Sequence, residues 1–377
     1  MGATHRRRGA VAIVALAVLA GACAAPAPGG PDPDLAPNAG EARYVGPGPY
    51  AAGVTTLSVG GRLVDVTYPA DPALATGPTE VADARAALPS SLRAQLRPSV
   101  DLTWNTGAHR DAAAAAGGPF PVVLNVHGFF LWRSAQATLA SHLASWGMVV
   151  ASPDFPEFGL AALDNGIGGP DTDGILDRVV AGLAAAGTAP SGPLHDIVDV
   201  SRLAVMGHSF GSLVATSYAK RPAVRVWIPL ASGSVPSLLF PRTDQGGATT
   251  ASLWLASTDD VTGAASGVAA TAAATVGPRA VAVLGAGGHS GAYTDLCLMG
   301  GSGFIAQLAS VGATLPNAAQ LSSGCSSAGP DPAARAVVRH LVTATLRQRL
   351  GLDADPVGLG LQVVGALPAP ITYTHTP

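Results

Sequence analysis

Ser209 lies between two glycines, in the segment GHSFG at residues 207–211. The apolar run 202–206 before it is typical of a buried strand, and residues 213–220 after it have the spacing of an apolar-faced helix. A serine on such an abrupt strand-to-helix turn has its hydroxyl exposed at the end of the strand, where it can act as a nucleophile. The flanking glycines fit this interpretation, because a Cβ there would strike the neighbouring backbone. The pattern predicts Ser209 as a catalytic nucleophile.

A serine hydroxyl is a weak nucleophile, so it needs a base to take its proton and an acid to orient that base. His289 follows the apolar run 280–285 by four residues, in the loop after a late strand, where such a base is expected. It is therefore the predicted base. The other histidines that we weighed are less suitably placed: His208 beside the serine, His127 after an early strand, His142 in a helix and His375 near the end of the chain.

The orienting acid is expected at the end of the strand before the one that precedes His289. The segment SLWLASTDD offers both Asp259 and Asp260 there. Two carboxylates directed at one imidazole would repel each other, so one of them serves and the other is a loop residue. The spacing after the strand favours Asp260, with Asp259 as the alternative.

Stabilisation of a tetrahedral oxyanion needs two N–H donors. One is expected from the backbone of Phe210, the residue after the nucleophile, and the other from Phe129, in the loop after the strand 121–127. Phe130 and Trp132 in the same loop have two interpretations. They line a pocket for the acyl group, or they pack into the core.

Strand and helix patterns alternate along the rest of the chain, which predicts an α/β fold: a mostly parallel sheet with helices on both faces. Two apolar runs joined at residues 60–61 predict an N-terminal antiparallel hairpin. Residues 71–118 are polar and poorly patterned, and we expect an exposed insertion with one short helix. The expected strands are 121–127, 147–154, 202–207, 224–230, 252–257 and 280–285, and the expected helices are 135–146, 173–186 and 331–350.

At these motifs the chain resembles the α/β-hydrolase superfamily. Within it, the chain is similar to the bacterial dienelactone-hydrolase-like and platelet-activating-factor-acetylhydrolase-like esterases, which are relatives of the cutinase-type polyester hydrolases. The resemblance implies Ser209 as nucleophile, Asp260 as acid, His289 as base, and Phe129 and Phe210 as oxyanion donors, with no metal or organic cofactor. The similar stretches span residues 48–70, 119–155, 201–213 and 285–297.

The spacing between the later strands bears on the shape of the site. About twenty residues separate the runs 224–230 and 252–257, too few for a large helical cap. We therefore expect a fairly open cleft. The segment DNGIGGPDTD at residues 164–173 lacks the alternating oxygen ligands of a calcium loop, so we interpret it as a solvated loop and expect no metal site.

The N-terminus predicts export. Three arginines, a short apolar run and small residues ending at Cys23 are typical of a secretory signal, with Cys23 placed for lipidation; simple cleavage after Cys23 is the alternative. Residues 24–46 then form a disordered tether, residues 47–352 the hydrolase domain and residues 353–377 a tail. In an oxidising compartment Cys297 and Cys325 pair as a disulfide; two free thiols are the alternative.

The composition limits the partners. Charged residues make up 12% of the 377 residues and the net charge is −3, which gives no electrostatic basis for nucleic-acid binding. We expect a monomer that acts on a small ester or lipid-like substrate and touches a membrane only through a lipid anchor. The hypothesis is an exported serine hydrolase of carboxylic esters. Acyl transfer on the same residues and a non-catalytic binding lipoprotein are the alternatives.

Overall fold

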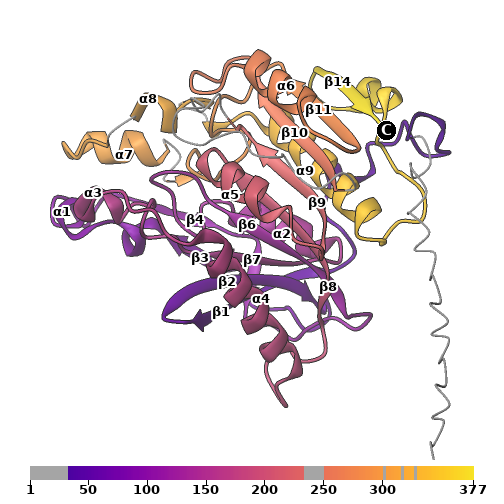
Figure 1. Cartoon of the computed structure of the whole chain (residues 1–377). Helices are drawn as coiled ribbons and strands as arrows, with labels where there is room; N and C mark the ends of the chain where they lie inside the picture. The colour runs from indigo at the N-terminus through magenta and orange to yellow at the C-terminus, as the bar shows by residue number, and fades with distance from the viewer. Residues whose placement is uncertain (1–32, 233–249, 300–302, 316–317, 327–328) are drawn as a thin grey trace, which may run out of the picture. The chain divides into compact units, whose positions relative to one another are not determined.

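Most of the described chain is built around one ten-stranded sheet (Figure 1). The computed structural model describes residues 33–232, 250–299, 303–315, 318–326 and 329–377. Its strand order is β14-β11-β10-β9-β8-β6-β7-β2-β1-β5, and the six strands from β11 to β7 are parallel. The strands are β1 (Ala51–Val59), β2 (Arg62–Ala70), β5 (Ala108–Arg110), β6 (Phe120–Val126), β7 (Val149–Pro153), β8 (Val198–His208), β9 (Val224–Leu230), β10 (Ala251–Ser257), β11 (Arg279–Leu284) and β14 (Ile371–Thr376).

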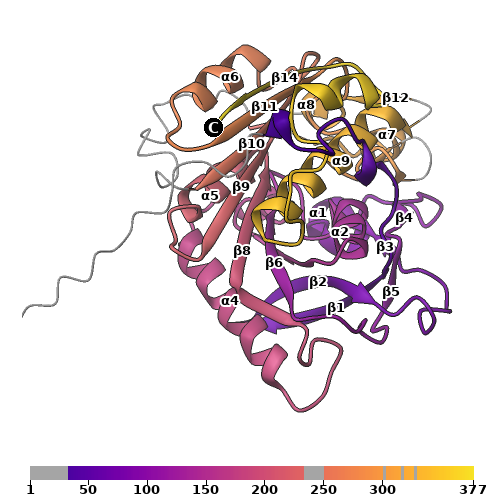
Figure 2. The same ribbon diagram turned by 90° about the vertical axis from the view of Figure 1, so that its right-hand side faces the viewer.

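Helices cover both faces of this sheet, as predicted. In Figure 2 the helices α4, α5 and α6 lie on one side of the central strands, and α2 and α9 lie on the other. The mostly parallel α/β fold predicted from the sequence is therefore confirmed. The helices are α2 (Ala137–Ser145), α4 (Thr172–Thr188), α5 (Phe210–Tyr218), α6 (Ala265–Ala273) and α9 (Pro332–Arg349).

Each central strand is apolar on both sides because both of its faces are covered. In β6, Val122 and Leu124 face the cluster under α4 and α5, whereas Val123 faces the cluster under α2 and α9. The same alternation places Val205 and Met206 of β8 in the two clusters. Continuous apolar runs are the sequence signature of parallel strands buried in this way. The rigid layer so formed holds the loops at the carboxyl ends of the strands.

The folded unit extends beyond both of its predicted ends. Within the predicted tether 24–46, residues 43–45 form a 3-10 helix, and Tyr44 is buried against Trp146 and α9. The predicted tail 353–377 contains β14, which pairs antiparallel with β11 at the edge of the sheet. Residues 43–45 are therefore part of the folded unit although the composition predicted a disordered tether, and β14 belongs to the sheet although it was assigned to a tail outside the domain. Long-range pairing and an aromatic contact hold these segments in place.

His340 joins these two terminal segments. Its Nδ1 accepts a hydrogen bond from the Tyr44 N–H (3.2 Å), and its Nε2–H donates to the Gly358 carbonyl (3.0 Å). Both ring nitrogens are thus used by the neutral imidazole. Burial lowers the pKa of His340 to about 4. Buried His142 and His208 have pKa values lowered in the same direction.

We expect the free energy of unfolding to fall as the pH drops from about 6.5, the ordinary pKa of histidine, to about 4. In this window the unfolded chain takes up protons that the folded chain does not, so stability rises with pH. Urea unfolding across this range measures the slope. A His340→Gln variant should show a smaller slope, even if it is less stable at neutral pH. Equal slopes in the two proteins would contradict this account.

The insertion 71–118 is less exposed than predicted. It contains α1 (Ser90–Arg93), the strand pair β3 (Val81–Asp83) and β4 (Thr103–Asn105), and the strand β5 of the main sheet. Its apolar side chains form a buried cluster with the loop after β6 and with α7 (Phe304–Ser310) and α8 (Ala318–Leu321). This packing could not be predicted from the local sequence, because the residues that pack against the insertion lie far from it in the chain. The insertion contributes Ala84, Leu88, Leu92, Val100, Leu102 and Trp104 to the cluster.

The described residues contain no helix with the length and apolar character needed to cross a bilayer. The predicted signal and Cys23 lie outside the described residues, so the lipid anchor stays a prediction. The prediction of an open cleft depends on the segment between β9 and β10, most of which also lies outside them.

Candidate active site

Ser209 occupies a strained turn between β8 and α5. Its backbone has φ 54° and ψ −118°, a region that residues with a side chain rarely adopt. A Cβ at Gly207 would lie 2.0 Å from the Gly211 carbonyl oxygen, and one at Gly211 would lie 2.2 Å from the Val126 oxygen. The Ser209 N–H donates to the Leu230 carbonyl (2.9 Å), which ties the turn to β9. Only glycine fits on either side of the serine, as the motif predicted.

The structure brings His289 and Asp260 to this serine from the loops after β11 and β10. His289 Nε2 lies 2.8 Å from Ser209 Oγ. On the other side of the ring, Nδ1 lies 2.9 Å from Asp260 Oδ2 and 3.1 Å from Oδ1. The imidazole and the carboxylate are both buried. The three predicted residues thus form one continuous hydrogen-bonded chain.

Asp260 is held in its ionised form. Burial alone would raise its pKa, but the hydrogen bond and charge interaction with His289 act against burial, and two backbone N–H groups add to them. These groups belong to Thr262 (2.7 Å) and Gly263 (3.0 Å), and both donate to Oδ1. The net effect lowers the pKa of Asp260 below its ordinary value. A carboxylate so held can orient the imidazole and stabilise its cation.

Asp259 has a different place in the structure. Its Oδ1 accepts the Gly288 N–H (2.8 Å), and its Oδ2 lies 3.4 Å from the Gly287 nitrogen. Its side chain therefore anchors the backbone just before His289, whereas the Asp260 side chain contacts the ring. The two candidates for the acid have separate contacts, and the repulsion expected for two carboxylates on one imidazole is avoided.

The loop after β6 presents Phe129 to the serine turn. Its ring stacks on that of Phe210 at 4.1 Å between centroids, and its N–H has no hydrogen-bond acceptor within the part of the chain that the structure describes. A Cβ on Gly128 would lie 3.0 Å from Ser209 Cβ, so the loop backbone runs directly beside the nucleophile. The Phe129 peptide therefore lies next to the turn of Ser209, where the oxyanion donor was predicted.

His127 orients that peptide group. Its Nε2 accepts the Phe155 N–H (3.0 Å), which leaves Nδ1 to donate to the Gly128 carbonyl (2.9 Å). In a planar trans peptide the Gly128 carbonyl and the Phe129 N–H point in opposite directions. By holding the carbonyl on one side, His127 directs the N–H to the other. From the sequence, His127 was considered only as a rival base, although its position next to Gly128 of the loop was a usable signal.

His208 contacts the backbone of His289, the predicted base. Its Nε2–H donates to the His289 carbonyl oxygen (2.7 Å), and the two rings lie 5.0 Å apart. Full burial lowers the pKa of His208 to about 3, so it is neutral and adds no charge beside the base. This contact was not predicted, because no local sequence pattern indicates which group the side chain next to Ser209 contacts.

Phe130 and Trp132 lie in the buried apolar cluster beside the insertion, with 8% and 3% of their surface exposed. Trp132 packs against Phe304 (5.3 Å between ring centroids) and Trp104 (6.1 Å). Of the two interpretations offered by the sequence, core packing and not an acyl pocket describes Phe130 and Trp132. Phe129 is only partly buried, and its ring stacks on that of Phe210, the residue after Ser209.

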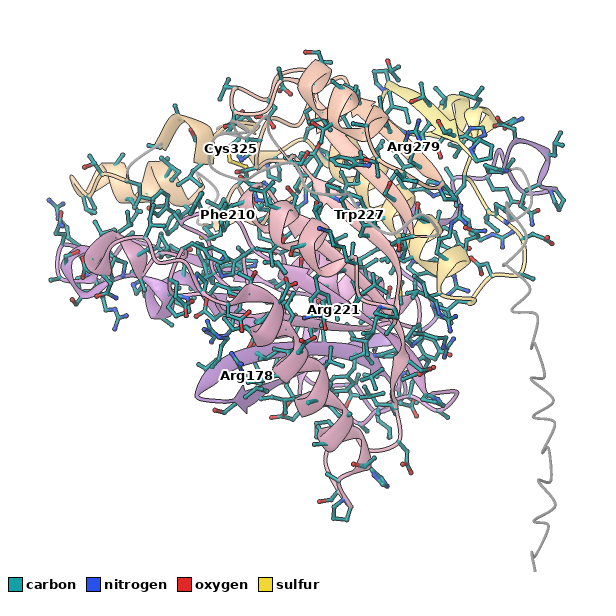
Figure 3. The ribbon with its side chains drawn as sticks, viewed as in Figure 1. Arg178, Phe210, Arg221, Trp227, Arg279 and Cys325 are labelled. Atoms are coloured by element: carbon teal, nitrogen blue, oxygen red, sulfur yellow. A yellow bond between two sulfur atoms is a disulfide. The ribbon has the colours of Figure 1, made fainter. Side chains whose placement is uncertain are left out.

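Cys297 and Cys325 form a disulfide close to the site. In Figure 3 the labelled Cys325 lies at the same end of the sheet as Phe210, the residue after Ser209.

In the part of the chain that is described, no group of three or more histidine, cysteine or acidic side chains is placed to hold a metal ion. In the loop 164–173, Asp171 caps α4 through the Gly174 N–H, and Asp164 accepts hydrogen bonds from Ser91.

In the comparison with known proteins, residues 112–227 match the Chlorophyllase family, an α/β-hydrolase-type family. This segment includes the loop with Phe129 and the turn with Ser209, and it ends before Asp260 and His289. No curated protein matches the chain. Together with the mostly parallel sheet, the match shows an α/β-hydrolase fold.

Proposed function

We propose that this α/β-hydrolase-fold protein is a carboxylic ester hydrolase with Ser209 as nucleophile, His289 as base and Asp260 as the orienting acid. The observation that carries the proposal is the hydrogen-bonded chain from Ser209 Oγ to His289 Nε2 (2.8 Å) and from His289 Nδ1 to Asp260 Oδ2 (2.9 Å). The fold and the Chlorophyllase match support an ester as the bond that is cleaved.

In the proposed reaction His289 takes the Ser209 proton as Oγ attacks the ester carbonyl. The Phe129 and Phe210 N–H groups then donate to the oxyanion of the tetrahedral intermediate. His289 gives the proton to the leaving alcohol, and an acyl-enzyme remains. Water that is deprotonated by His289 attacks the acyl-enzyme, releases the acid and restores Ser209.

Asp260 contributes at each of these steps without giving up its charge. It accepts the Nδ1–H of His289, which fixes the tautomer that leaves Nε2 free to take a proton. When the ring becomes cationic, the adjacent carboxylate stabilises it. The lowered pKa of Asp260 supports this role, since the group stays ionised through the neutral range.

We further propose that the protein is an exported esterase of the dienelactone-hydrolase-like and platelet-activating-factor-acetylhydrolase-like kind, tethered through lipid on Cys23. The disulfide between Cys297 and Cys325 supports an oxidising compartment, where such bonds persist. The motif resemblance around Ser209 and His289 supports the choice of relatives. The expected substrates are small esters with a short acyl group.

A fluorophosphonate probe tests this function directly. Incubation of the protein with the probe, followed by peptide mass spectrometry, is expected to place the label on Ser209, with parallel hydrolysis of p-nitrophenyl acetate. A protein that only binds would not react, and a label on another serine would contradict the assignment. Product analysis with an added alcohol separates hydrolysis from acyl transfer, because a transferase would form the new ester in preference to the free acid.

A further inference from the structure

The loop that carries His289 lies against a segment from a distant part of the chain, residues 322–325. The Ser323 hydroxyl accepts the His289 N–H (3.1 Å). The Ser323 carbonyl accepts the N–H groups of both Ser290 and Gly291 (3.1 Å each). One residue therefore holds three consecutive N–H groups of the base loop. The Ser323 hydroxyl also lies within 3.4 Å of the Asp259 carbonyl, in the loop before the proposed acid.

The two backbones are packed with no space for a side chain between them. A Cβ on Gly288 would lie 2.2 Å from the Gly324 nitrogen, and a Cβ on Gly291 would lie 2.2 Å from the Gly324 oxygen. A Cβ on Gly324 would in turn lie 2.0 Å from the Gly287 oxygen. Gly288 and Gly324 also have positive φ. The glycines on both sides of His289 are thus explained by this contact.

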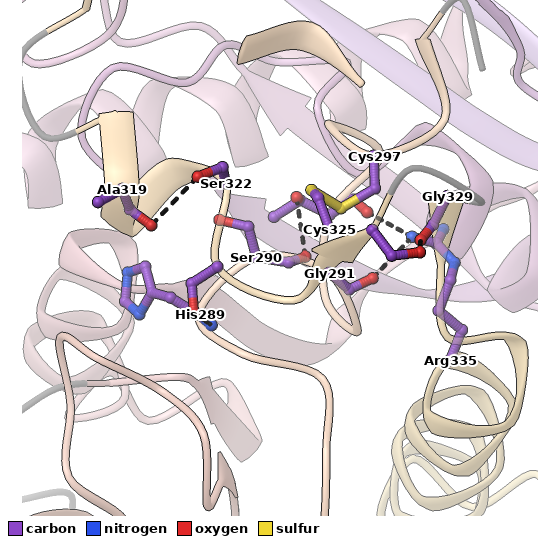
Figure 4. Close-up of a disulfide and its surroundings, with 12 residues drawn as sticks. His289, Ser290, Gly291, Cys297, Ala319, Ser322, Cys325, Gly329 and Arg335 are labelled. Carbon is purple, nitrogen blue, oxygen red and sulfur yellow. Dashed lines mark hydrogen bonds between the residues drawn. A yellow bond between two sulfur atoms is a disulfide. The ribbon is translucent and has the colours of Figure 1, made fainter. Parts of the chain in front are cut away.

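The disulfide fixes the far side of the same segment (Figure 4). Cys325 follows Gly324 directly and is joined to buried Cys297. Near Cys297, the buried Asp295 pairs with Arg335 of α9 (2.6 Å) and accepts the Thr138 N–H of α2 (2.9 Å). The covalent bond therefore ties residues 322–325 to a part of the chain that is anchored to two core helices.

We propose that Ser323 is a positioning residue for the base: held by the Cys297–Cys325 disulfide, it sets the backbone of His289 so that the imidazole reaches Ser209. This inference rests on the proposed function. Its reason is geometric, because proton transfer needs the ring within hydrogen-bond reach of the hydroxyl, and a displacement of about 1 Å can cost on the order of a hundredfold in rate. The hydroxyl acts on the backbone of His289 and does not touch the reacting atoms.

A Ser323→Ala variant tests the proposal. We expect kcat for p-nitrophenyl acetate to fall about tenfold with KM nearly unchanged, because the ring is displaced while the acyl pocket is intact. Ser323→Thr keeps the hydroxyl and should recover most of kcat. Ser322→Ala is the matched control, since the partly exposed Ser322 hydroxyl donates to the Ala319 carbonyl of α8 and, among the described residues, makes no hydrogen bond to the loop that carries His289; its kcat should equal that of the wild type.

Removal of the disulfide tests the second half of the proposal. The double variant Cys297→Ala/Cys325→Ala should lose kcat to a similar extent, and adding Ser323→Ala should cost little more, because both changes release the same segment. Fully multiplicative losses would contradict a shared mechanism. Melting temperatures measured alongside separate this effect from loss of folded protein.

Amide hydrogen exchange gives a readout that does not depend on activity. In Ser323→Ala the His289 N–H loses its acceptor, so its exchange should become faster, whereas in Ser322→Ala it should not. If the wild-type protein hydrolyses no ester but exchange of the His289 N–H is faster in Ser323→Ala, the proposed function is contradicted and the contact of Ser323 with the His289 backbone is still supported. Wild-type kcat and unchanged exchange in Ser323→Ala would overturn the positioning role alone.

Discussion

Replacement of Ser209 by alanine is expected to lower kcat/KM for p-nitrophenyl acetate by at least about 10⁴-fold. The change removes the only atom that we assign to covalent attack, while the oxyanion donors are left in place. The residual rate would be that supplied by substrate binding and the N–H groups. Ser and Ala both carry a Cβ at this positive φ, so we expect the melting temperature to change little.

Ser217→Ala, in the helix α5 that follows Ser209, is the matched control. Its hydroxyl is exposed and lies 3.3 Å from Asp173 of α4, so it belongs to a different set of contacts from the candidate site. We expect this variant to hydrolyse the ester at the wild-type rate and to react with the fluorophosphonate probe. Near-normal turnover by Ser209→Ala would remove the basis of the proposed mechanism.

The second large effect is expected from the acid. Asp260→Asn should lower kcat by about 10³- to 10⁴-fold near neutral pH, because an amide can present an N–H to Nδ1 and thereby favour the wrong tautomer of His289. The loss of the charge also removes the stabilisation of the imidazolium. Since the pKa of Asp260 is already below its ordinary value, the wild-type carboxylate is ionised throughout the neutral range and the deficit should persist across it.

Asp259→Asn is the comparison that discriminates between the two carboxylates. Its side chain accepts the Gly288 N–H, and an asparagine oxygen can accept the same bond. We therefore expect a loss of about tenfold at most. Steady-state kinetics of both variants on one ester measure the difference. A larger loss in Asp259→Asn than in Asp260→Asn would reverse the assignment of the acid.

The site residues that the sequence predicted are those constrained by local geometry. The turn around Ser209 tolerates only glycine at positions 207 and 211, so the motif has a direct steric explanation. The alternation of apolar runs and helical patterns predicted the parallel sheet, because strands covered on both faces must be apolar throughout. His289 and Asp260 followed from this order, since the carboxyl ends of parallel strands meet at one edge.

Other features depended on contacts between residues far apart in the chain. The separate places of Asp259 and Asp260 are determined by which backbone N–H groups each carboxylate meets. Burial of Trp132 depends on Trp104 and Phe304, which no local pattern connects to it.

The sequence by itself predicted the candidate nucleophile and the order of the candidate site residues, and it determined the class of fold, because each is encoded in short-range sterics or in apolar periodicity. Only the tertiary structure decided that β14 extends the sheet at its edge, that His127 holds the Gly128–Phe129 peptide and that Ser323 contacts the loop that carries His289. The physical reason is that these contacts join residues far apart in the sequence. The residues next to either partner then show no local pattern from which the contact could be predicted.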